Sequence, residues 1–283
     1  MATLLDGKAL AGALREQLKA RVTTVSRRLG RPPGLAVVLV GNDPGSQVYV
    51  RSKEKAAAEL GIRSEFVRLE ASATQQEIAG TVARLNADAS VDGLLVQLPL
   101  PEGVDETEIV AGIGPAKDAD GLHPESLGRL LKGIVGPRPC TPSGVLALLD
   151  AARIEIAGKR AVVVGRSNIV GKPMALMLLE RHATVTLCHS RTQALDAEIR
   201  RAEILVVAMG KPRFVRGDWI AEGSVVIDVG TNRVDSKLVG DVEFESASRH
   251  AAFITPVPGG VGPLTVAMLM RNTVELAERR PVG

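Results

Sequence analysis

The sequence predicts an α/β protein of two domains, the second of which is a doubly wound nucleotide-binding domain. The length of 283 residues leaves room for two cores, since a domain typically takes roughly 150 residues. Strand-like apolar runs alternate with helical patterns along the chain, which is typical of βαβ units and a mainly parallel sheet. In the second half, a strand leads through a glycine-containing turn into a helix, as in nucleotide-binding folds.

The first half is predicted to contain helices and strands in alternation. From residue 7 to residue 30 apolar residues recur at steps of three or four, which indicates an amphipathic helix that ends at a glycine. Residues 46–60 show the same pattern, and residues 74–77 form a capping box that opens a further helix. Strands are predicted at residues 35–40, 62–69 and 93–98, the first and last from their apolar runs.

The second half is predicted to form the nucleotide-binding sheet. Its strands are expected at residues 160–165, 184–188, 204–208 and 225–229, with helices at 170–181 and 194–201. Residues 112–142 are rich in Gly and Pro, which suggests a domain boundary near Cys140. A helix is expected at residues 143–152, at the far end of this stretch. A last helix, 264–278, is expected to pack back on the first domain. The predicted domains are residues 1–139 with residues 264–283, and residues 140–263.

Composition excludes several classes of function. Aromatic residues make up 2% of the chain, and the net charge of +3 is not concentrated in blocks, so we expect no nucleic-acid partner. The positive charge suits a small anionic ligand. The chain has no secretory leader pattern and no run of 18 apolar residues, which predicts a cytoplasmic protein without a membrane partner. Cys140 and Cys188 are expected to be buried thiols, and the four histidines lack metal-ligand spacing, so no metal is expected.

A turn between strand and helix predicts a cofactor site. Gly165, Arg166, Ser167 and Gly171 lie where free backbone N–H groups and the positive end of a helix meet, which suits a pyrophosphate. Ser167 stands where the second glycine of the usual fingerprint is found. A structural turn without a ligand remains the alternative, because a single glycine turn is weak evidence.

The end of the next strand favours NADP over NAD. An NAD-specific fold normally carries an acid there for the ribose hydroxyls, whereas this strand is followed by Ser190 and Arg191. With Arg166, these residues offer a hydroxyl and two guanidinium groups to a 2′-phosphate. The alternative is that the arginines only form part of the solvated surface.

Candidate chemical residues lie in the first half. Tyr49 and Lys53 are four residues apart, so a helix places both on one face, where the ring could stack on a planar substrate and a desolvated amine could transfer protons. An ordinary surface pair is the alternative. Gln97 ends a buried strand, where ligands gather in open α/β sheets, although the prolines after it could simply end the strand.

Two further segments have unusual local chemistry. Asp118 and Asp120 follow Lys117 in a tight loop, so one acid could pair with the lysine and leave the other for a ligand; the remaining ligands of a calcium loop are missing. Residues 255–263 contain three prolines and three glycines before a helix, which predicts either a shaped backbone surface for a ligand or a rigid linker.

The chain resembles the bifunctional methylenetetrahydrofolate dehydrogenase/cyclohydrolase enzymes over nearly its whole length. Six segments in order carry the resemblance: residues 46–53, 92–101, 117–121, 139–142, 165–173 and 256–263. It implies NADP-dependent oxidation of 5,10-methylenetetrahydrofolate, hydrolysis of the 5,10-methenyl product to 10-formyltetrahydrofolate, and a homodimer.

The resemblance also implies a role for each site residue. Lys53 is the central catalytic residue, Tyr49 stacks on the folate, Gln97 positions Lys53, and Asp120 binds the pterin. Gly165, Arg166, Ser167, Gly171, Ser190, Arg191 and Thr231 are expected to contact NADP, and Pro258, Gly259 and Gly262 to contact the substrate. Thr231 departs from the family, whose members commonly carry isoleucine at this place. A chain with dehydrogenase activity alone, or a non-catalytic NADP sensor, are the competing hypotheses.

Overall fold

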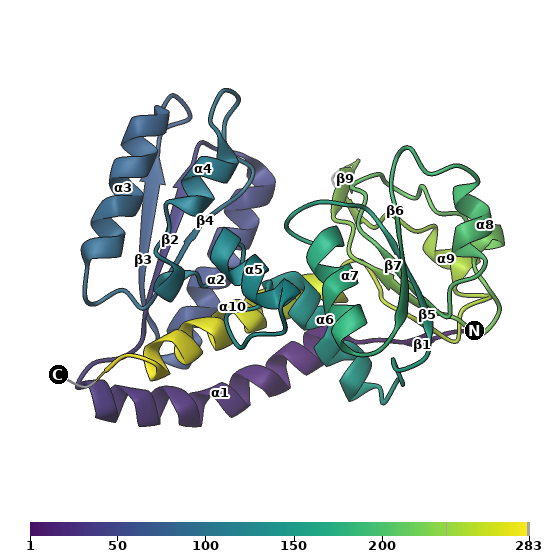
Figure 1. Cartoon of the computed structure of the whole chain (residues 1–283), viewed down its shortest axis with the longest axis horizontal. Helices are drawn as coiled ribbons and strands as arrows, with labels where there is room; N and C mark the ends of the chain where they lie inside the picture. The colour runs from purple at the N-terminus through teal and green to yellow at the C-terminus, as the bar shows by residue number, and fades with distance from the viewer. Residues whose placement is uncertain (236, 282–283) are drawn as a thin grey trace. The chain divides into compact units, whose positions relative to one another are not determined.

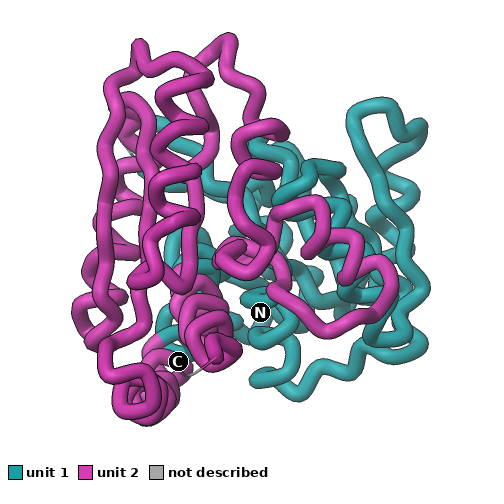
Figure 2. The backbone as a smooth tube through the Cα atoms, turned by 60° about the vertical axis from the view of Figure 1, so that its left-hand side comes forward, with its two compact units in different colours: residues 1–11, 141–265 teal, residues 12–140, 266–283 magenta. Residues whose placement is uncertain are grey.

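The computed structural model describes residues 1–235 and 237–281, which form two compact units. Unit 1 comprises residues 1–11 and 141–265, and unit 2 comprises residues 12–140 and 266–283 (Figure 2). Both are α/β units with parallel sheets, which confirms the predicted fold class. The C-terminal helix α10 (Val261–Glu278) starts in unit 1 and ends in unit 2, so the return of the chain to the first domain is confirmed.

Unit 2 is built on a short parallel sheet with the strand order β3-β2-β4 (Figure 1). Its core against one face combines alternate residues of β2 and β4 with apolar side chains of α3 and α4. The elements are α1 (Gly7–Leu29, which begins in unit 1), β2 (Gly34–Val40), α2 (Pro44–Leu60), β3 (Arg63–Leu69), α3 (Gln75–Ala87), β4 (Gly93–Val96), α4 (Glu106–Ala111), a 3-10 turn η1 (Pro115–Lys117) and α5 (Pro124–Leu131).

Local sequence explains where the unit 2 helices begin and end. The Asp43 side chain accepts a hydrogen bond from the Ser46 N–H at 2.7 Å, and Gly61 closes α2 in the left-handed conformation. Helix α2 therefore starts at Pro44, two residues earlier than predicted, because proline suits the first turn. The capping box of α3 is confirmed, since Thr74 and Glu77 bond to each other's backbone N–H.

Unit 1 is a doubly wound sheet of six parallel strands in the order β1-β11-β8-β7-β5-β6. Its core is aliphatic, with valines of β5, β7 and β8 buried on both faces. The elements are β1 (Thr3–Leu4), α6 (Cys140–Ala151, whose first residue belongs to unit 2), β5 (Arg160–Val164), α7 (Gly171–Glu180), β6 (Thr184–Cys188), α8 (Leu195–Ile199), β7 (Ile204–Val207), η2 (Gly217–Trp219), β8 (Val225–Asp228), β9 (Asn232–Val234), β10 (Lys237–Val239), α9 (Phe244–Ala247) and β11 (Phe253–Ile254).

Several short elements escaped prediction. Strands β1 and β11 have two residues each and exist because they pair with each other, and β11 with β8. Helix α5 lies within the stretch that its Gly and Pro content suggested was irregular; it begins with Pro124 and is capped by the His123 ring, which accepts from the Glu125 N–H. Proline at a first helical position starts a helix, so its presence alone was misleading.

The buried carboxylate of Asp92 links the segment after α1 to the end of the chain in unit 2. Asp92 is fully buried and binds the Arg31 guanidinium through both oxygens, at 2.7 and 2.9 Å, while it also accepts the Gly34 N–H at 2.8 Å. Arg280, just beyond α10, approaches the same carboxylate at 3.3 Å and donates to the Val91 carbonyl at 2.6 Å. The residue before β4 thereby holds the segment after α1 and the end of the chain.

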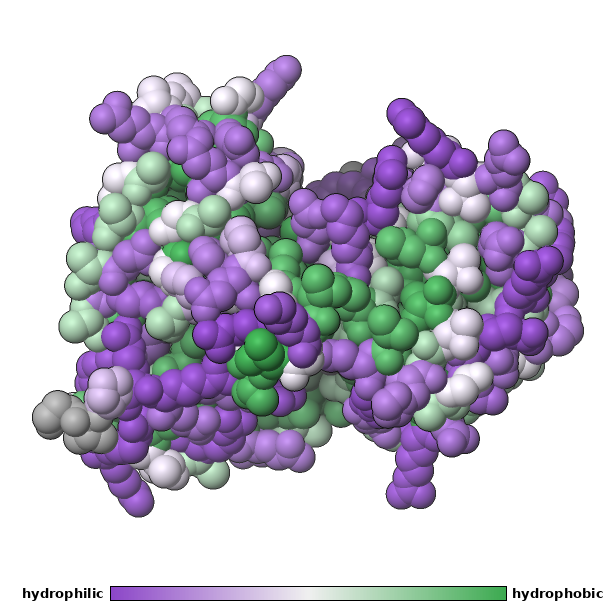
Figure 3. Space-filling model, in the orientation of Figure 1, coloured by the Kyte–Doolittle hydropathy of each residue, from purple (hydrophilic) through white to green (hydrophobic). Residues whose placement is uncertain are grey.

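Charged and apolar side chains are interspersed on the face seen in Figure 3. Large apolar residues with high exposure include Leu131 and Val135, in and after α5. Within the part of the chain that the structure describes, no helix has the length and apolar character needed to cross a bilayer.

Candidate active site

Lys53 is one of two buried lysines among the described residues of unit 2, with 6% exposure; the other is Lys117, with 7%. Lys53 projects from the buried face of α2 that also carries Val50 and Ala57. Its ammonium donates to Gln97 Oε1 at 2.8 Å, and Gln97 Nε2 donates to the Leu98 carbonyl at 2.7 Å, which fixes the amide with its oxygen towards the lysine. The expected pairing of Lys53 and Gln97 is therefore present.

Asp120 and Cys140 complete the surroundings of Lys53. Burial lowers the pKa of Lys53, and the nearby negative charge of Asp120 opposes that shift. Burial, together with Asp120, raises the pKa of the Cys140 thiol well above its usual value, so the thiol is neutral; it donates to the Ala119 carbonyl at 3.4 Å. The site thus holds an ammonium group, a carboxylate and a neutral thiol near one another.

The loop that carries Asp120 is shaped by Asp118. The Asp118 carboxylate is buried and accepts backbone N–H groups of Gly121, Leu122 and His123 at 2.9–3.2 Å. Lys117 pairs with neither acid, contrary to the possibility raised by the sequence. Its ammonium instead donates to the carbonyls of Leu85 and Asp88 at 3.1 and 2.6 Å, at the end of α3.

Tyr49 lies one helical turn before Lys53 in α2 and is half-buried. This position matches the expected common face of ring and amine.

The turn from β5 to α7 is a close-packed backbone cradle in unit 1. A Cβ on Gly165 would lie 2.1 Å from the Ala208 carbonyl oxygen, and one on Gly171 would lie 1.9 Å from the Gly165 oxygen, so both positions require glycine. The Ser167 hydroxyl accepts the N–H groups of Val170 and Gly171 at 3.1 and 3.3 Å. These two N–H groups are therefore occupied within the turn.

The end of β6 presents hydroxyl and guanidinium groups without an acid. Ser190 and Arg191 are exposed, as is Arg166 in the neighbouring turn. The Arg191 backbone N–H donates to His189 Nδ1 at 3.1 Å, which sets the turn and leaves the guanidinium without a protein partner among the hydrogen bonds and ion pairs of the described residues. These residues and the glycine cradle fit a dinucleotide with a 2′-phosphate.

Two buried carboxylates brace the loops at the carboxyl ends of β7 and β8. Asp228 accepts the N–H groups of Gly230, Asp241 and Val242 at 2.8–2.9 Å. Asp241 accepts the N–H groups of the loop 209–211 and the Asn232 amide. The exposed Thr231 therefore sits in a loop whose flanking residues are both held by buried acids.

Burial raises the pKa of Asp228 to about 6, against the opposing effect of its N–H donors. An unfolded aspartate titrates near pH 3.9, so the folded chain holds this proton across the interval between the two values. The contribution of Asp228 to stability is complete below about pH 4 and is lost as the pH rises through 6, with a change of about 3 kcal/mol. Carboxyl ¹³C NMR should give a midpoint near 6 for Asp228, and a midpoint below 4 would contradict this account.

The segment 255–263 is tightly folded backbone within unit 1. Gly259 has a φ of +108° and its carbonyl accepts the Lys8 N–H at 2.9 Å, while the Gly260 N–H bonds to the Pro256 carbonyl at 2.8 Å. Pro258 is exposed and Gly262 lies in the first turn of α10. The three expected substrate contacts lie in unit 1, whereas Tyr49, Lys53, Gln97 and Asp120 lie in unit 2.

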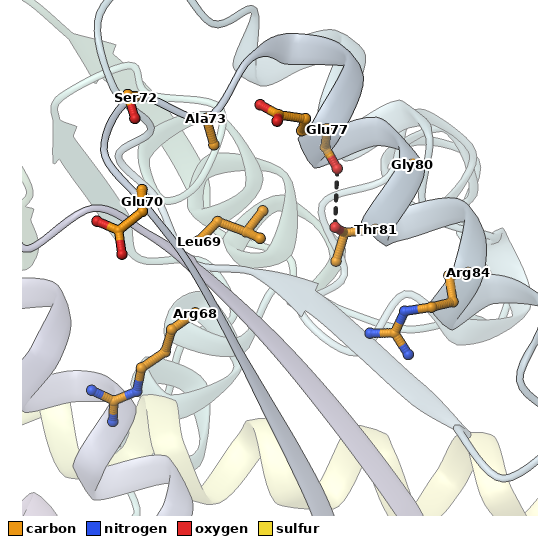
Figure 4. A pocket seen from close by; sticks show the side chains of 9 residues that line it. All are labelled: Arg68, Leu69, Glu70, Ser72, Ala73, Glu77, Gly80, Thr81 and Arg84. Atoms are coloured by element: carbon orange, nitrogen blue, oxygen red, sulfur yellow. Dashed lines mark hydrogen bonds between the residues drawn. The ribbon is translucent and has the colours of Figure 1, made fainter.

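A shallow groove of about 640 Å³ lies elsewhere in unit 2, between β3 and α3 (Figure 4). Arg68 and Glu70 line one side, and Thr81 and Arg84 line the other. None of the candidate site residues contributes to it. Among the described residues, no cluster of His, Cys, Asp and Glu could hold a metal ion.

Three residues shape the site in ways that the sequence did not predict. Cys140 was interpreted only as a buried thiol; it is buried, but it also contacts Asp120. Asp118 was one of two equivalent acids, and Asn272 was an unremarked polar residue in an apolar helix. The sequence signal that could have identified Asn272 was a single amide side chain on the buried face of α10.

Comparison with known proteins matches both parts of the chain to one family. The model of the tetrahydrofolate dehydrogenase/cyclohydrolase catalytic domain matches residues 5–120, and that of the family's NAD(P)-binding domain matches residues 139–281. The Bifunctional protein FolD of Halothermothrix orenii is 57% identical over 97% of this chain and 98% of its own length. That of Anaeromyxobacter dehalogenans is 58% identical over 98% of each.

Solved structures agree with the sequence relatives. The bifunctional FolD enzyme of Campylobacter jejuni superposes with a TM-score of 0.96 at 48% identity, covering 99% of this chain and 100% of that one. The Trypanosoma brucei dehydrogenase-cyclohydrolase, solved with NADP and an inhibitor, gives 0.94 at 44% identity over 98% of both chains. The chain belongs to the tetrahydrofolate dehydrogenase/cyclohydrolase family.

Proposed function

We propose that one set of side chains, Tyr49, Lys53, Gln97 and Asp120, serves both reactions of this bifunctional enzyme. The chain oxidises 5,10-methylenetetrahydrofolate with NADP and hydrolyses the 5,10-methenyl product to 10-formyltetrahydrofolate. The observation that carries the proposal is the buried Lys53 ammonium, bonded to Gln97 and near Asp120. We assign folate chemistry to residues 1–139 with 264–283, and NADP binding to residues 140–263.

Asp120 and Tyr49 are proposed to hold the pterin. A carboxylate can accept two hydrogen bonds from the ring N–H and amino groups, and a tyrosine ring can stack on the pterin plane. The backbone of Pro258, Gly259 and Gly262 is proposed to contact the same substrate. Fixing the ring in this way orients its one-carbon bridge for reaction.

Lys53 is proposed to manage the proton in hydrolysis. NADP, when bound, accepts the hydride of the methylene bridge, which leaves an electrophilic methenyl carbon. Water attacks this carbon, and a lysine whose pKa is lowered by burial takes up and returns a proton more readily than an exposed lysine. Gln97 keeps the amine in place through the 2.8 Å hydrogen bond.

Absorbance assays of the purified chain test the two reactions separately. We expect reduction of NADP with 5,10-methylenetetrahydrofolate, and accelerated decay of added 5,10-methenyltetrahydrofolate. Reduction without faster decay would leave a dehydrogenase alone, and the absence of both would remove the enzymatic assignment.

NADP selectivity is proposed to depend on Ser190, Arg166 and Arg191. We expect Arg191→Ala to weaken NADP binding by about 10- to 100-fold, because a charge-assisted hydrogen bond to the 2′-phosphate is lost. Isothermal titration with both dinucleotides measures this. NAD lacks the 2′-phosphate and is the matched control, so an equal loss for NAD would contradict the assignment.

We also propose that the chain works in the cytoplasm as a homodimer. The dimer rests on the family resemblance, and sedimentation velocity tests it: a mass near twice 29.8 kDa is expected.

A further inference from the structure

We infer that Asn272, on the C-terminal helix α10, is a positioning residue that sets the orientation of Asp120 for folate binding. The inference rests on the proposed role of Asp120 in binding the pterin. Asn272 and all of its partners lie within unit 2.

The Asn272 amide links two chain segments beside the site. It is a buried side chain, and its Nδ2 group donates to the carbonyl oxygens of Ala119 and Arg138, each at 2.9 Å. It also lies 3.5 Å from Cys140 Sγ. An amide nitrogen has two hydrogens, so both are used by these two carbonyls.

Each of these carbonyls is next to a group that contacts Asp120. The Ala119 carbonyl belongs to the peptide bond that carries the Asp120 nitrogen, so holding it fixes the plane from which the Asp120 side chain departs. The Arg138 carbonyl lies two residues before Cys140, whose backbone N–H donates to the Asp120 carbonyl at 3.3 Å. The Cys140 thiol donates to the Ala119 carbonyl at 3.4 Å, so this oxygen is held by both Cys140 and Asn272.

The two segments meet without space for another side chain. Gly121 has a φ of +72°, and a Cβ there would lie 2.4–2.6 Å from backbone atoms of Arg138 and Pro139. Because the glycine backbone packs directly against these atoms, a shift of one segment displaces the other. The helix supplies a fixed platform for the linking amide, because the neighbouring Thr273 is fully buried and Gly93 of β4 lies against it.

Replacing the amide should therefore loosen Asp120 while the reacting groups remain. We expect Asn272→Leu, which keeps the branched shape in a larger side chain and removes both donors, to weaken binding of tetrahydrofolate to the NADP-bound chain about tenfold. The affinity for NADP should stay within about twofold. Asn272→Ser keeps one donor in a smaller side chain, so its tetrahydrofolate affinity should lie between those of the wild type and Asn272→Leu. This variant replaces Asn272→Leu in the test if the leucine variant does not fold.

Thr273→Val is the matched control, because its hydroxyl donates only to the Leu269 carbonyl within α10. It removes a buried polar group from the same helix and should change tetrahydrofolate affinity less than twofold. If Asn272→Leu has no larger effect than Thr273→Val, the inference is wrong.

A double-mutant cycle with Asp120→Asn separates this inference from the proposed function. If Asn272 acts through Asp120, the tenfold effect of Asn272→Leu should shrink to below about twofold in the Asp120→Asn background. A full tenfold effect in that background overturns the positioning role alone. If Asp120→Asn itself leaves tetrahydrofolate affinity unchanged, the role of Asp120 fails and the inference falls with it.

Discussion

Lys53→Met is expected to lower methenyl hydrolysis at least about 100-fold, while NADP binds nearly as in the wild type. Positioned acid–base groups typically contribute factors of this size or more. Methionine keeps a similar length but cannot exchange a proton, and it leaves Gln97 Oε1 without its 2.8 Å partner. Decay of 5,10-methenyltetrahydrofolate measures the hydrolysis, and calorimetric titration measures NADP affinity.

Lys55→Met is the matched control on the same helix. The Lys55 side chain is 79% exposed and reaches only Glu59, at 3.8 Å. The identical substitution there should leave both reactions unchanged, since an exposed pair of this kind contributes little. Undiminished hydrolysis in Lys53→Met would exclude the lysine from the mechanism.

Asp92→Ala is expected to lower the free energy of unfolding by about 3 kcal/mol, because it breaks a buried ion pair and leaves charged partners behind. Arg31 loses both of its hydrogen bonds to the carboxylate, and the Gly34 N–H loses its acceptor. Arg280 loses its 3.3 Å contact, which also weakens the attachment of the chain end. Guanidinium denaturation followed by circular dichroism measures the change.

Asp150→Ala tests whether burial is the cause. Asp150 and Arg181 form the same two-pronged pair, at 2.6 and 3.1 Å, but their side chains are 50% and 42% exposed. Water can replace the lost contact there, so we expect a change below about 1 kcal/mol. Equal losses of unfolding free energy in the two variants would mean that burial does not strengthen the Asp92 network.

The Arg31–Asp92–Arg280 contact also shows why local patterns have limits. Asp92 stands just before a predicted strand, and nothing in its neighbourhood distinguishes it from a surface acid. Its partners are 61 and 188 residues away in sequence. Pairing at such separations depends on how the sheet and helices pack, which periodicity does not encode.

The sequence by itself determined the α/β class, the main helices and strands, and the turn from β5 to α7. These features depend on neighbouring residues: apolar periodicity, capping side chains and glycines in tight turns. The motif resemblance also supplied the family, including Lys53 and Gln97 as candidate partners. The common face of Tyr49 and Lys53 needed only the helical repeat.

Only the tertiary structure decided which groups meet. It brought Gln97, which follows β4, to Lys53 on α2, and it placed Cys140 against Asp120. It also directed the Lys117 ammonium to the end of α3 and away from both acids of its loop. It also brought Asn272 of the last helix to the Asp120 loop. Such contacts arise from the packing of elements that are far apart in the chain, and burial then sets the pKa of Lys53, a property that no local pattern specifies.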